Sequence, residues 1–330
     1  MHRILARLAL LALMLVAVPA GWMVWFAANP VPLASSPLEF RIRPGTGLRA
    51  VARELAEAGM RFAPWQFELL ARVRGESTRI KAGSYEVETG ITPLHVLEKI
   101  TRGDVSQGEL RIAEGWTFRQ VRSALDGAGD LAHDSAGLTD REILSRIGAT
   151  EGSPEGLFFP DTYLFDRHAA DLDVLRRAYR QMRRTLEAEW ERRTPSLPYA
   201  GPYQALIVAS LIEKETGRAE DRPSVAAVFV NRLRRGMPLQ TDPSVIFGLG
   251  AGFDGNLRKA DLLRDTAYNT YTRAGLPPTP IAMPGLASIQ AALHPARSDH
   301  LYFVARGDGS SAFSRTLDEH NRAVARYQKR

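Results

Sequence analysis

The stretch YQALIVASLIEKETG (203–217) places ten mostly apolar residues directly before a short charged run. A helix that is apolar on nearly all sides is buried, so we expect a central helix whose C-terminal end emerges at the boundary of the core. On that helix Leu206, Ser210 and Glu213 share one face, whereas Glu215 lies about 200° further round. The stretch therefore predicts a globular domain built around one buried helix, with Glu213 as its candidate chemical group.

The expected position of Glu213 suits a general acid. Partial burial and the negative end of the helix dipole both favour the neutral form of its carboxyl group. A carboxyl group that stays protonated near neutral pH can donate a proton in catalysis. The alternative is a helix that ends in a solvated Glu-Lys-Glu cap without a catalytic role. Because Glu215 points elsewhere, we expect its replacement to be much milder than that of Glu213.

Two stretches further along are dense in polar and aromatic residues and lack helical or strand periodicity. They are LQTDPSVIFGLG (239–250) and TAYNTYTRAGLPPTPIAMPG (266–285). Such loops suit sugar binding, because sugars present hydroxyl edges for hydrogen bonds and C–H faces for aromatic rings. Asp242, which precedes Pro243, is equally explained as a helix cap. These residues by themselves leave a functional and a structural interpretation open.

The sequence around the central helix predicts further helices and one hairpin. Residues 117–193 are expected to be mainly helical, with a long helix near 170–193, and 240–285 to be rich in loops. The other expected elements are helices over 222–235, 286–293 and 317–328 and a β-hairpin formed by 301–306 and 311–316.

Residues 39–107 predict a small α/β unit. Strands are expected at EFRIRP (39–44) and GSYEVE (83–88), with helices over 48–59 and 63–73 between them. Thr92-Pro93 then provides an N-cap and a proline in the first turn of another helix. The order strand–helix–helix–strand resembles a LysM-type glycan-binding module; a spacer domain is the alternative interpretation.

The first thirty residues predict the location of the protein. Leu8 to Ala28 is a run of 21 residues without a charge, and about 20 apolar residues span a bilayer core. Arg3 and Arg7 precede this run, and no cationic residue follows it before Arg41. The positive-inside rule therefore predicts a cytoplasmic tail over 1–7.

A cleaved signal peptide is the competing interpretation of the same segment. Val18-Pro19-Ala20 has the small residues of a cleavage site. The apolar run continues for eight residues beyond Ala20, which favours a transmembrane anchor over 8–28, followed by a Pro/Ser-rich linker over 29–38. Both interpretations export the rest of the chain.

The composition restricts the classes of function. The chain of 330 residues has 43 Lys and Arg against 37 Asp and Glu, a net charge of +6, which suits nucleic acid, an anionic membrane or an anionic wall polymer. The absence of cysteine excludes disulfides, thiolate metal sites and a cysteine nucleophile. There is no HExxH, GxSxG, SxxK, zinc-finger or P-loop motif. We therefore expect no metal, no cofactor and no nucleic-acid partner.

Several segments together resemble the MltG/YceG-like family of endolytic murein transglycosylases. They occur in the family's order along essentially the whole chain, and KAGSYEVETG (81–90) fits its LysM-like part. The matching segments are AEGWTFRQV (113–121), EGLFFPDTYLF (155–165), ASLIEKETG (209–217), VFVNRLRRGMPLQTDPSVIFGLG (228–250), AYNTYTRAGLPPTPIAMPG (267–285), AALHPA (291–296) and LYFVA (301–305).

The resemblance implies an α/β (α+β) fold with an N-terminal transmembrane helix, a LysM-like subdomain over 39–107 and a larger catalytic domain over 108–330. It also implies that Glu213 is the catalytic glutamate. The positions that it implies for the substrate cleft are Gln240, Thr241, Asp242, Tyr268, Asn269 and Tyr271.

The activity implied by the resemblance is cleavage of the β-1,4 bond between N-acetylmuramic acid and N-acetylglucosamine in nascent peptidoglycan strands. The products would carry 1,6-anhydromuramic ends, and the cut would terminate elongation of the glycan. The implied partners are the peptidoglycan strands, the inner membrane and peptidoglycan synthases, with the catalytic domain in the periplasm. A non-catalytic, membrane-anchored peptidoglycan-binding scaffold is the alternative.

Overall fold

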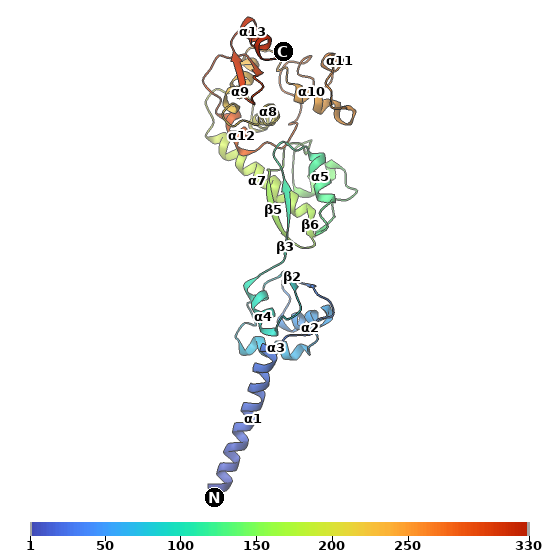
Figure 1. Ribbon diagram of the computed structural model, residues 1–330, viewed down its shortest axis with the longest axis vertical. Helices are drawn as coiled ribbons and strands as arrows, with labels where there is room; N and C mark the ends of the chain where they lie inside the picture. The colour runs from blue at the N-terminus through green and yellow to red at the C-terminus, as the bar shows by residue number, and fades with distance from the viewer. Residues whose placement is uncertain (1, 329–330) are drawn as a thin grey trace. The chain divides into compact units, whose positions relative to one another are not determined.

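The structure is a computed structural model that describes the backbone of residues 2–328. In the first helix, α1 (His2–Ala28), it describes the side chains from Arg7 onward except those of Ala9 and Ala12. Helices alternate with short two-stranded sheets, so the predicted mixed α/β class is confirmed (Figure 1). The chain forms two compact units: unit 1 comprises Met1–Gly108 and Leu164–His168, and unit 2 comprises Glu109–Tyr163 and Ala169–Arg330.

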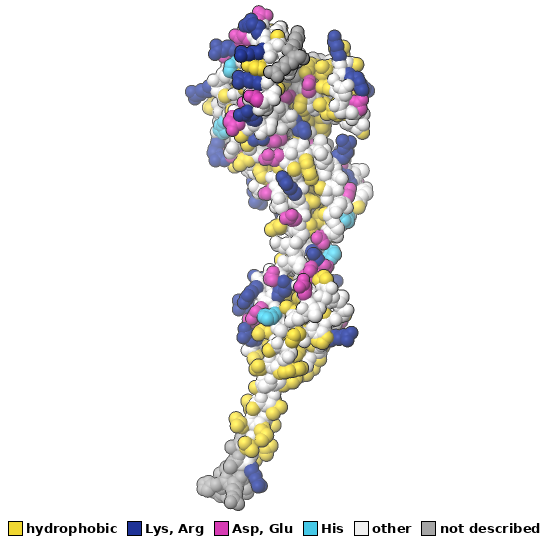
Figure 2. Space-filling view, in the orientation of Figure 1, with side chains coloured by type: hydrophobic (Ala, Val, Ile, Leu, Met, Phe, Trp, Pro, Cys, Tyr) yellow, Lys and Arg dark blue, Asp and Glu magenta, His cyan; other side chains and the backbone are white. Residues whose placement is uncertain are grey.

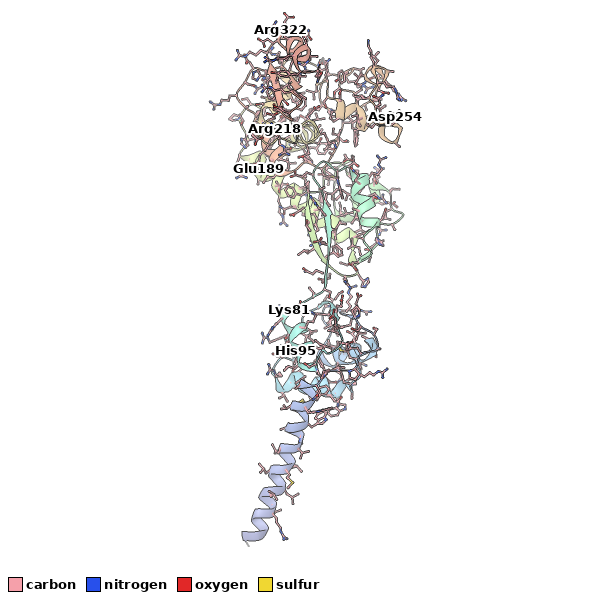
Figure 3. All side chains as sticks on the ribbon, in the orientation of Figure 1. Lys81, His95, Glu189, Arg218, Asp254 and Arg322 are labelled. Carbon is pink, nitrogen blue, oxygen red and sulfur yellow. The ribbon has the colours of Figure 1, made fainter. Side chains whose placement is uncertain are left out.

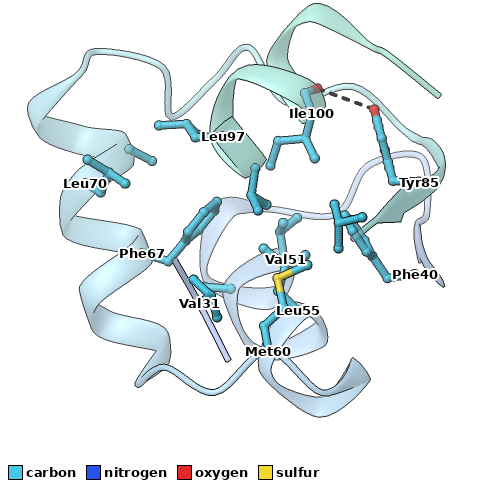
Figure 4. Packing of buried hydrophobic residues seen from close by; sticks show 14 of the residues in the cluster. Val31, Phe40, Val51, Leu55, Met60, Phe67, Leu70, Tyr85, Leu97 and Ile100 are labelled. Carbon is cyan, nitrogen blue, oxygen red and sulfur yellow. Dashed lines mark hydrogen bonds between the residues drawn. The ribbon is translucent and has the colours of Figure 1, made fainter. Parts of the chain in front are cut away.

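Unit 1 contains the predicted strand–helix–helix–strand order. Strands β1 (Leu38–Ile42) and β2 (Gly83–Val87) pair antiparallel and enclose α2 (Leu48–Ala58) and α3 (Pro64–Val73) in the sequence. Helix α4 (Pro93–Arg102) follows, and the Thr92 hydroxyl accepts a hydrogen bond from its first turn. The core residues drawn in Figure 4 include Val51, Leu55, Phe67, Tyr85 and Ile100. A glycan-binding role for this unit stays a prediction.

The C-terminal turns of α1 pack against the core of unit 1. Phe26 is buried there, and the Trp22 ring stacks on the Trp65 ring of α3 with their centroids 5.3 Å apart. Among the residues that the structure describes, no helix is long and apolar enough to cross a membrane. The predicted tail over 1–7 and the predicted anchor over 8–28 lie partly outside the described side chains.

Unit 2 is built around α8 (Pro202–Glu215), the helix that the opening stretch predicts. Its residues from Ala205 to Ile212 are all buried, so the prediction of a central buried helix is confirmed. The helices that pack against it are α7 (Asp171–Glu191), α9 (Arg222–Arg234), α10 (Asp242–Leu249) and α12 (Leu286–Leu293).

Smaller elements complete the fold. The strand pairs are β3 (Gln107–Ile112) with β5 (Asp161–Asp166), β4 (Leu131–Ala132) with β6 (Ala169–Ala170), and β7 (Tyr302–Ala305) with β8 (Ser311–Ser314). The remaining helices are α5 (Phe118–Asp126), α6 (Asp140–Ile147), η1 (Gly250–Gly252), α11 (Lys259–Leu263) and α13 (Leu317–Tyr327). The β7–β8 pair confirms the predicted hairpin.

Two elements are not among those that the sequence predicts, although 240–285 is rich in loops as expected. The region 117–193 contains strand β5, because every second side chain of DTYLFD turns inward to the core at Tyr163 and Phe165. The region 240–285 contains α10, whose Pro243 occupies a first-turn position where no backbone N–H is required. Helix α10 has apolar residues on more than one side, so it lacks the amphipathic period by which a surface helix is recognised.

Candidate active site

The two glutamates at the end of α8 have different surroundings. The Glu213 carboxylate accepts a hydrogen bond from the Gly285 N–H at 3.0 Å and lies 3.5 Å from the Arg222 guanidinium. Its side chain is 7% exposed and that of Arg222 is 12% exposed, so the pair is nearly buried. These contacts connect the end of α8 to the starts of α9 and α12.

Glu215 lines a pocket that Glu213 does not reach. The pocket has a volume of about 600 Å³ and receives Gln240 and Asp242 from the start of α10 and Tyr271 from the following loop. Arg232 of α9 also lines it. Hairpin β7–β8 and helix α13 complete the lining with Tyr302, Phe303, Val304, Ala305, Ser311, Leu317, His320, Asn321, Val324 and Gln328.

The electrostatics of this pocket favour a protonated Glu215. Burial raises the pKa of Glu215 to about 7; the Thr241 hydroxyl opposes this shift and the charge of Asp242 adds to it. The Tyr271 hydroxyl donates a hydrogen bond to the Asp242 carboxylate at 2.5 Å. Burial and that carboxylate also raise the pKa of Tyr271. A carboxyl group with a raised pKa thus shares the pocket with a second carboxyl group that accepts a hydrogen bond from Tyr271.

Arg232 holds the backbone that carries these groups. Its guanidinium is buried and donates to the carbonyl oxygens of Leu301 at 2.7 Å and Leu239 at 3.0 Å and to the side-chain oxygen of Gln240 at 3.0 Å. It also lies 5.0 Å from the centre of the Tyr302 ring. Gln240 has φ 55°, a left-handed conformation that non-glycine residues rarely adopt. The bonds from Arg232 stabilise this turn, which directs Asp242 into the pocket.

Comparison with known proteins identifies the family. Residues 40–326 match the YceG-like family model. The chain belongs to the YceG-like family. The predicted resemblance is therefore confirmed, and the match extends over both structural units.

Individual relatives agree with this assignment. The chain is 31% identical over 311 residues to the endolytic murein transglycosylase of Bacillus subtilis strain 168, covering 88% of this chain and 84% of that protein. It is 27% identical over 317 residues to the Streptococcus pneumoniae D39 protein of the same name, of which it spans 57%. The crystal structure of a YceG-like protein from Listeria monocytogenes superposes with a TM-score of 0.55 at 26% identity, over 86% of this chain and 97% of that one.

Only some of the six residues predicted to line the substrate cleft come together in the structure. Gln240, Asp242 and Tyr271 line the pocket of Glu215. Thr241 is buried beside Glu215, and its N–H donates to the Thr270 hydroxyl at 3.0 Å.

Asn269 and Tyr268 have supporting roles outside that pocket. The Asn269 side chain is fully buried and donates to three carbonyl oxygens of the segment 261–264, while its own oxygen accepts the Tyr271 N–H. It therefore folds the loop that positions Tyr271. The Tyr268 hydroxyl shares a hydrogen bond with Thr279, and its ring packs edge-on against Phe247, with centroids 4.9 Å apart.

The sequence-based reasoning missed Glu215, Arg232, Tyr302 and His320 as members of the pocket. Glu215 lies about 200° round α8 from Glu213 and so was not expected to share its surroundings, but α10 and its neighbours cover the side on which Glu215 lies. Among the residues that the structure describes, no group of three or more His, Asp or Glu side chains is arranged to hold a metal ion.

Proposed function

We propose that this chain is an endolytic murein transglycosylase with Glu215 as its acid/base carboxyl group. The observation that carries the proposal is a buried carboxyl with a pKa raised to about 7, in a polar pocket of about 600 Å³. Similarity to proteins named endolytic murein transglycosylases supports the same activity. A binding scaffold would need no carboxyl group tuned to this range.

The reaction that we propose requires one proton donor and no added nucleophile. Protonated Glu215 donates to the glycosidic oxygen as the bond from that oxygen to C1 of N-acetylmuramic acid breaks. Positive charge develops at C1 and the ring oxygen, and the Asp242 carboxylate, fixed by the Tyr271 hydroxyl, stabilises it. Ionised Glu215 then takes the proton of the C6 hydroxyl as that oxygen bonds to C1. The proton and the electrons balance, and a 1,6-anhydro ring results.

The pH dependence of strand cleavage tests this function. We expect purified glycan strands to be cut internally, with kcat constant up to about pH 7 and then falling about tenfold per pH unit, because the acid form of Glu215 is lost above its pKa. Replacing Asp242 by Asn removes a charge that raises this pKa, so the alkaline limb should move to lower pH. The measurement is kcat from pH 5 to 9.

The exposed Asp173 of α7 provides the control for that experiment. It forms an ion pair with Arg176, and neither residue lines the pocket of Glu215. Asp173→Asn should therefore leave the pH profile unchanged. Two outcomes would contradict the proposal: no cleavage of strands at any pH, or a profile that already declines from pH 5 upward, as a carboxyl group with an ordinary pKa would give.

We also infer that α1 anchors the protein in the inner membrane with the rest of the chain in the periplasm, beside the synthases that make nascent strands. The uncharged run over 8–28 supports this location. Yellow hydrophobic side chains gather on the coloured part of α1 in Figure 2. Leu15 is 76% exposed and Val16 is 68% exposed. Water is a poor solvent for such a surface.

The mature N-terminus distinguishes the anchor from a signal peptide. We expect mass spectrometry of the protein extracted from membranes to find the first residues retained. Because the chain has no native cysteine, a single cysteine at Arg7 should react with a thiol reagent only when the reagent crosses the membrane. A mature chain that begins at Gly21 would exclude the anchor.

A further inference from the structure

A second pocket of unit 2 lies between α5 and α10, and we call it the α5–α10 pocket. It has a volume of about 680 Å³ and shares no lining residue with the pocket of Glu215. Helix α10 joins the two, because Asp242 in its first turn lines the Glu215 pocket while Ile246 and Phe247 line the α5–α10 pocket. A helix rises 1.5 Å per residue, so these contributions are separated by about 6–8 Å along the axis.

The α5–α10 pocket combines aromatic rings with charged and polar groups. Phe253 follows η1 and precedes Asp254, which is labelled in Figure 3. The apolar lining consists of Phe118, Pro154, Ile246, Phe247 and Phe253, and the polar lining of Thr117, Arg119, Arg122, Asp140, Ser153 and Glu155. A saccharide matches both kinds of lining, since its C–H faces pack on rings and its hydroxyl edges form hydrogen bonds.

Glu155 is a buried carboxyl group in this pocket that the proposed reaction does not use. It is 7% exposed, and its two oxygens accept the Phe118 N–H at 3.0 and 3.1 Å. Burial raises the pKa of Glu155 to about 7. Near neutral pH the group therefore offers a hydrogen-bond donor in one protonation state and an acceptor in both, which suits the hydroxyl and amide groups of amino sugars.

We propose that the α5–α10 pocket is a second saccharide subsite, which holds sugars of the same glycan strand a short distance from the bond cut at Glu215. The proposal rests on the function proposed above and adds a second place at which the strand is held. An enzyme that cuts within a strand must bind sugars beyond the scissile bond. Arg119 is exposed in the lining, where its charge suits the carboxylates that muramic acid and its peptide carry.

Chain-length dependence of cleavage by the full-length protein tests the subsite. Phe253→Ala removes one ring of the lining, and we expect it to raise KM for long strands about 3- to 10-fold with kcat unchanged. A single disaccharide, with one sugar on each side of the scissile bond, has no further sugar to place in the α5–α10 pocket, so the variant and the unsubstituted protein should cut it with equal KM. Arg119→Gln should act in the same direction without removing a packed ring. Leu263→Ala is the matched control, since Leu263 is 70% exposed on α11 and lines neither pocket.

The outcomes separate this proposal from the proposed function. If the unsubstituted protein cuts long strands and both variants keep its KM, the subsite is excluded and the function stands. A rise in KM that is equal for short and long substrates would mean a disturbed Glu215 pocket and would also exclude the subsite. If the unsubstituted protein cuts neither substrate, the proposed function itself fails. A KM increase confined to long strands supports the subsite.

Discussion

Replacing Glu215 by Gln should lower the rate of strand cleavage by a factor of about 10²–10⁴, the usual contribution of one acid–base group. Glutamine has nearly the same shape, but it has no acidic proton to give to the glycosidic oxygen. Because burial raises the pKa of the carboxyl group that it replaces to about 7, about half of these groups are already uncharged at neutral pH, and the melting temperature should change little. The measurement is kcat on purified strands together with a thermal melt of each protein.

Glu213→Gln is the matched control, two residues away on the same helix. Its expected effect is on stability: the substitution leaves the nearly buried Arg222 guanidinium without its carboxylate, which costs about 3 kcal/mol. Glutamine can still accept the Gly285 N–H. We therefore expect a melting temperature lower by several degrees, with kcat within a factor of ten of the unsubstituted protein at 25 °C. If Glu213→Gln instead abolished cleavage in a stable protein while Glu215→Gln remained active, the acid would be Glu213, as the sequence predicts.

The second large effect concerns the fate of water in the reaction. Cleavage in ¹⁸O-labelled water should leave no label at the new ends, and every new muramic end should have the mass of a 1,6-anhydro sugar, one water less than a hydrolysis product. The physical reason is the state of the second carboxyl group. The Asp242 carboxylate accepts a hydrogen bond from the Tyr271 hydroxyl at 2.5 Å, which stabilises the anion and lowers its nucleophilicity.

Hydrolysis would require Asp242 to act chemically beside Glu215. Two carboxyl groups in one pocket are also what glycoside hydrolases have, with the second as nucleophile or as the base for a water molecule. Tyr271→Phe tests this, because it removes the hydrogen bond and frees Asp242 while keeping the ring. Because the hydroxyl is what restrains Asp242, we expect slower cleavage with ¹⁸O at a fraction of the new ends. Incorporation of ¹⁸O by the unsubstituted protein would contradict the proposed ring closure and assign Asp242 a covalent or base role.

Apolar periodicity and turn residues in the sequence were sufficient to predict most of the helices and strands. The ends of α2 at Gly59 and of α4 at Gly103 follow from residues that adopt positive φ without strain, and the hairpin β7–β8 follows from two alternating runs around a glycine-rich turn. One exception is α10. Its residues DPSVIFGL have no single apolar face because α8 packs against one side and rings from the 266–285 loop, such as Tyr268, against another.

The candidate site was predictable as a set of segments but not as a set of side chains. Residues around 239–242 and around 271 line one pocket at the end of α8. The resemblance implies that these segments form the substrate cleft. The helical wheel of α8 separates Glu213 from Glu215 correctly but does not say which of the two faces that pocket. The sequence contains no sign that Arg232 is buried, since an arginine on a helix is usually solvated. Its burial is explained by hydrogen bonds to the carbonyl groups of Pro238, Leu239 and Leu301 and to the Gln240 side chain.

By itself, then, the sequence determined the buried central helix, the family and the two loops that supply the pocket, because these depend on apolar periodicity and on long motifs within contiguous stretches. The tertiary structure decided which glutamate lies beside Asp242 and Tyr271, and it placed Glu213 against Arg222 and Gly285 instead. The physical reason is that burial and neighbouring charges act through space. Burial raises the pKa of Glu215, and the charge of Asp242, more than twenty residues away in the chain, raises it further; no local pattern records that proximity.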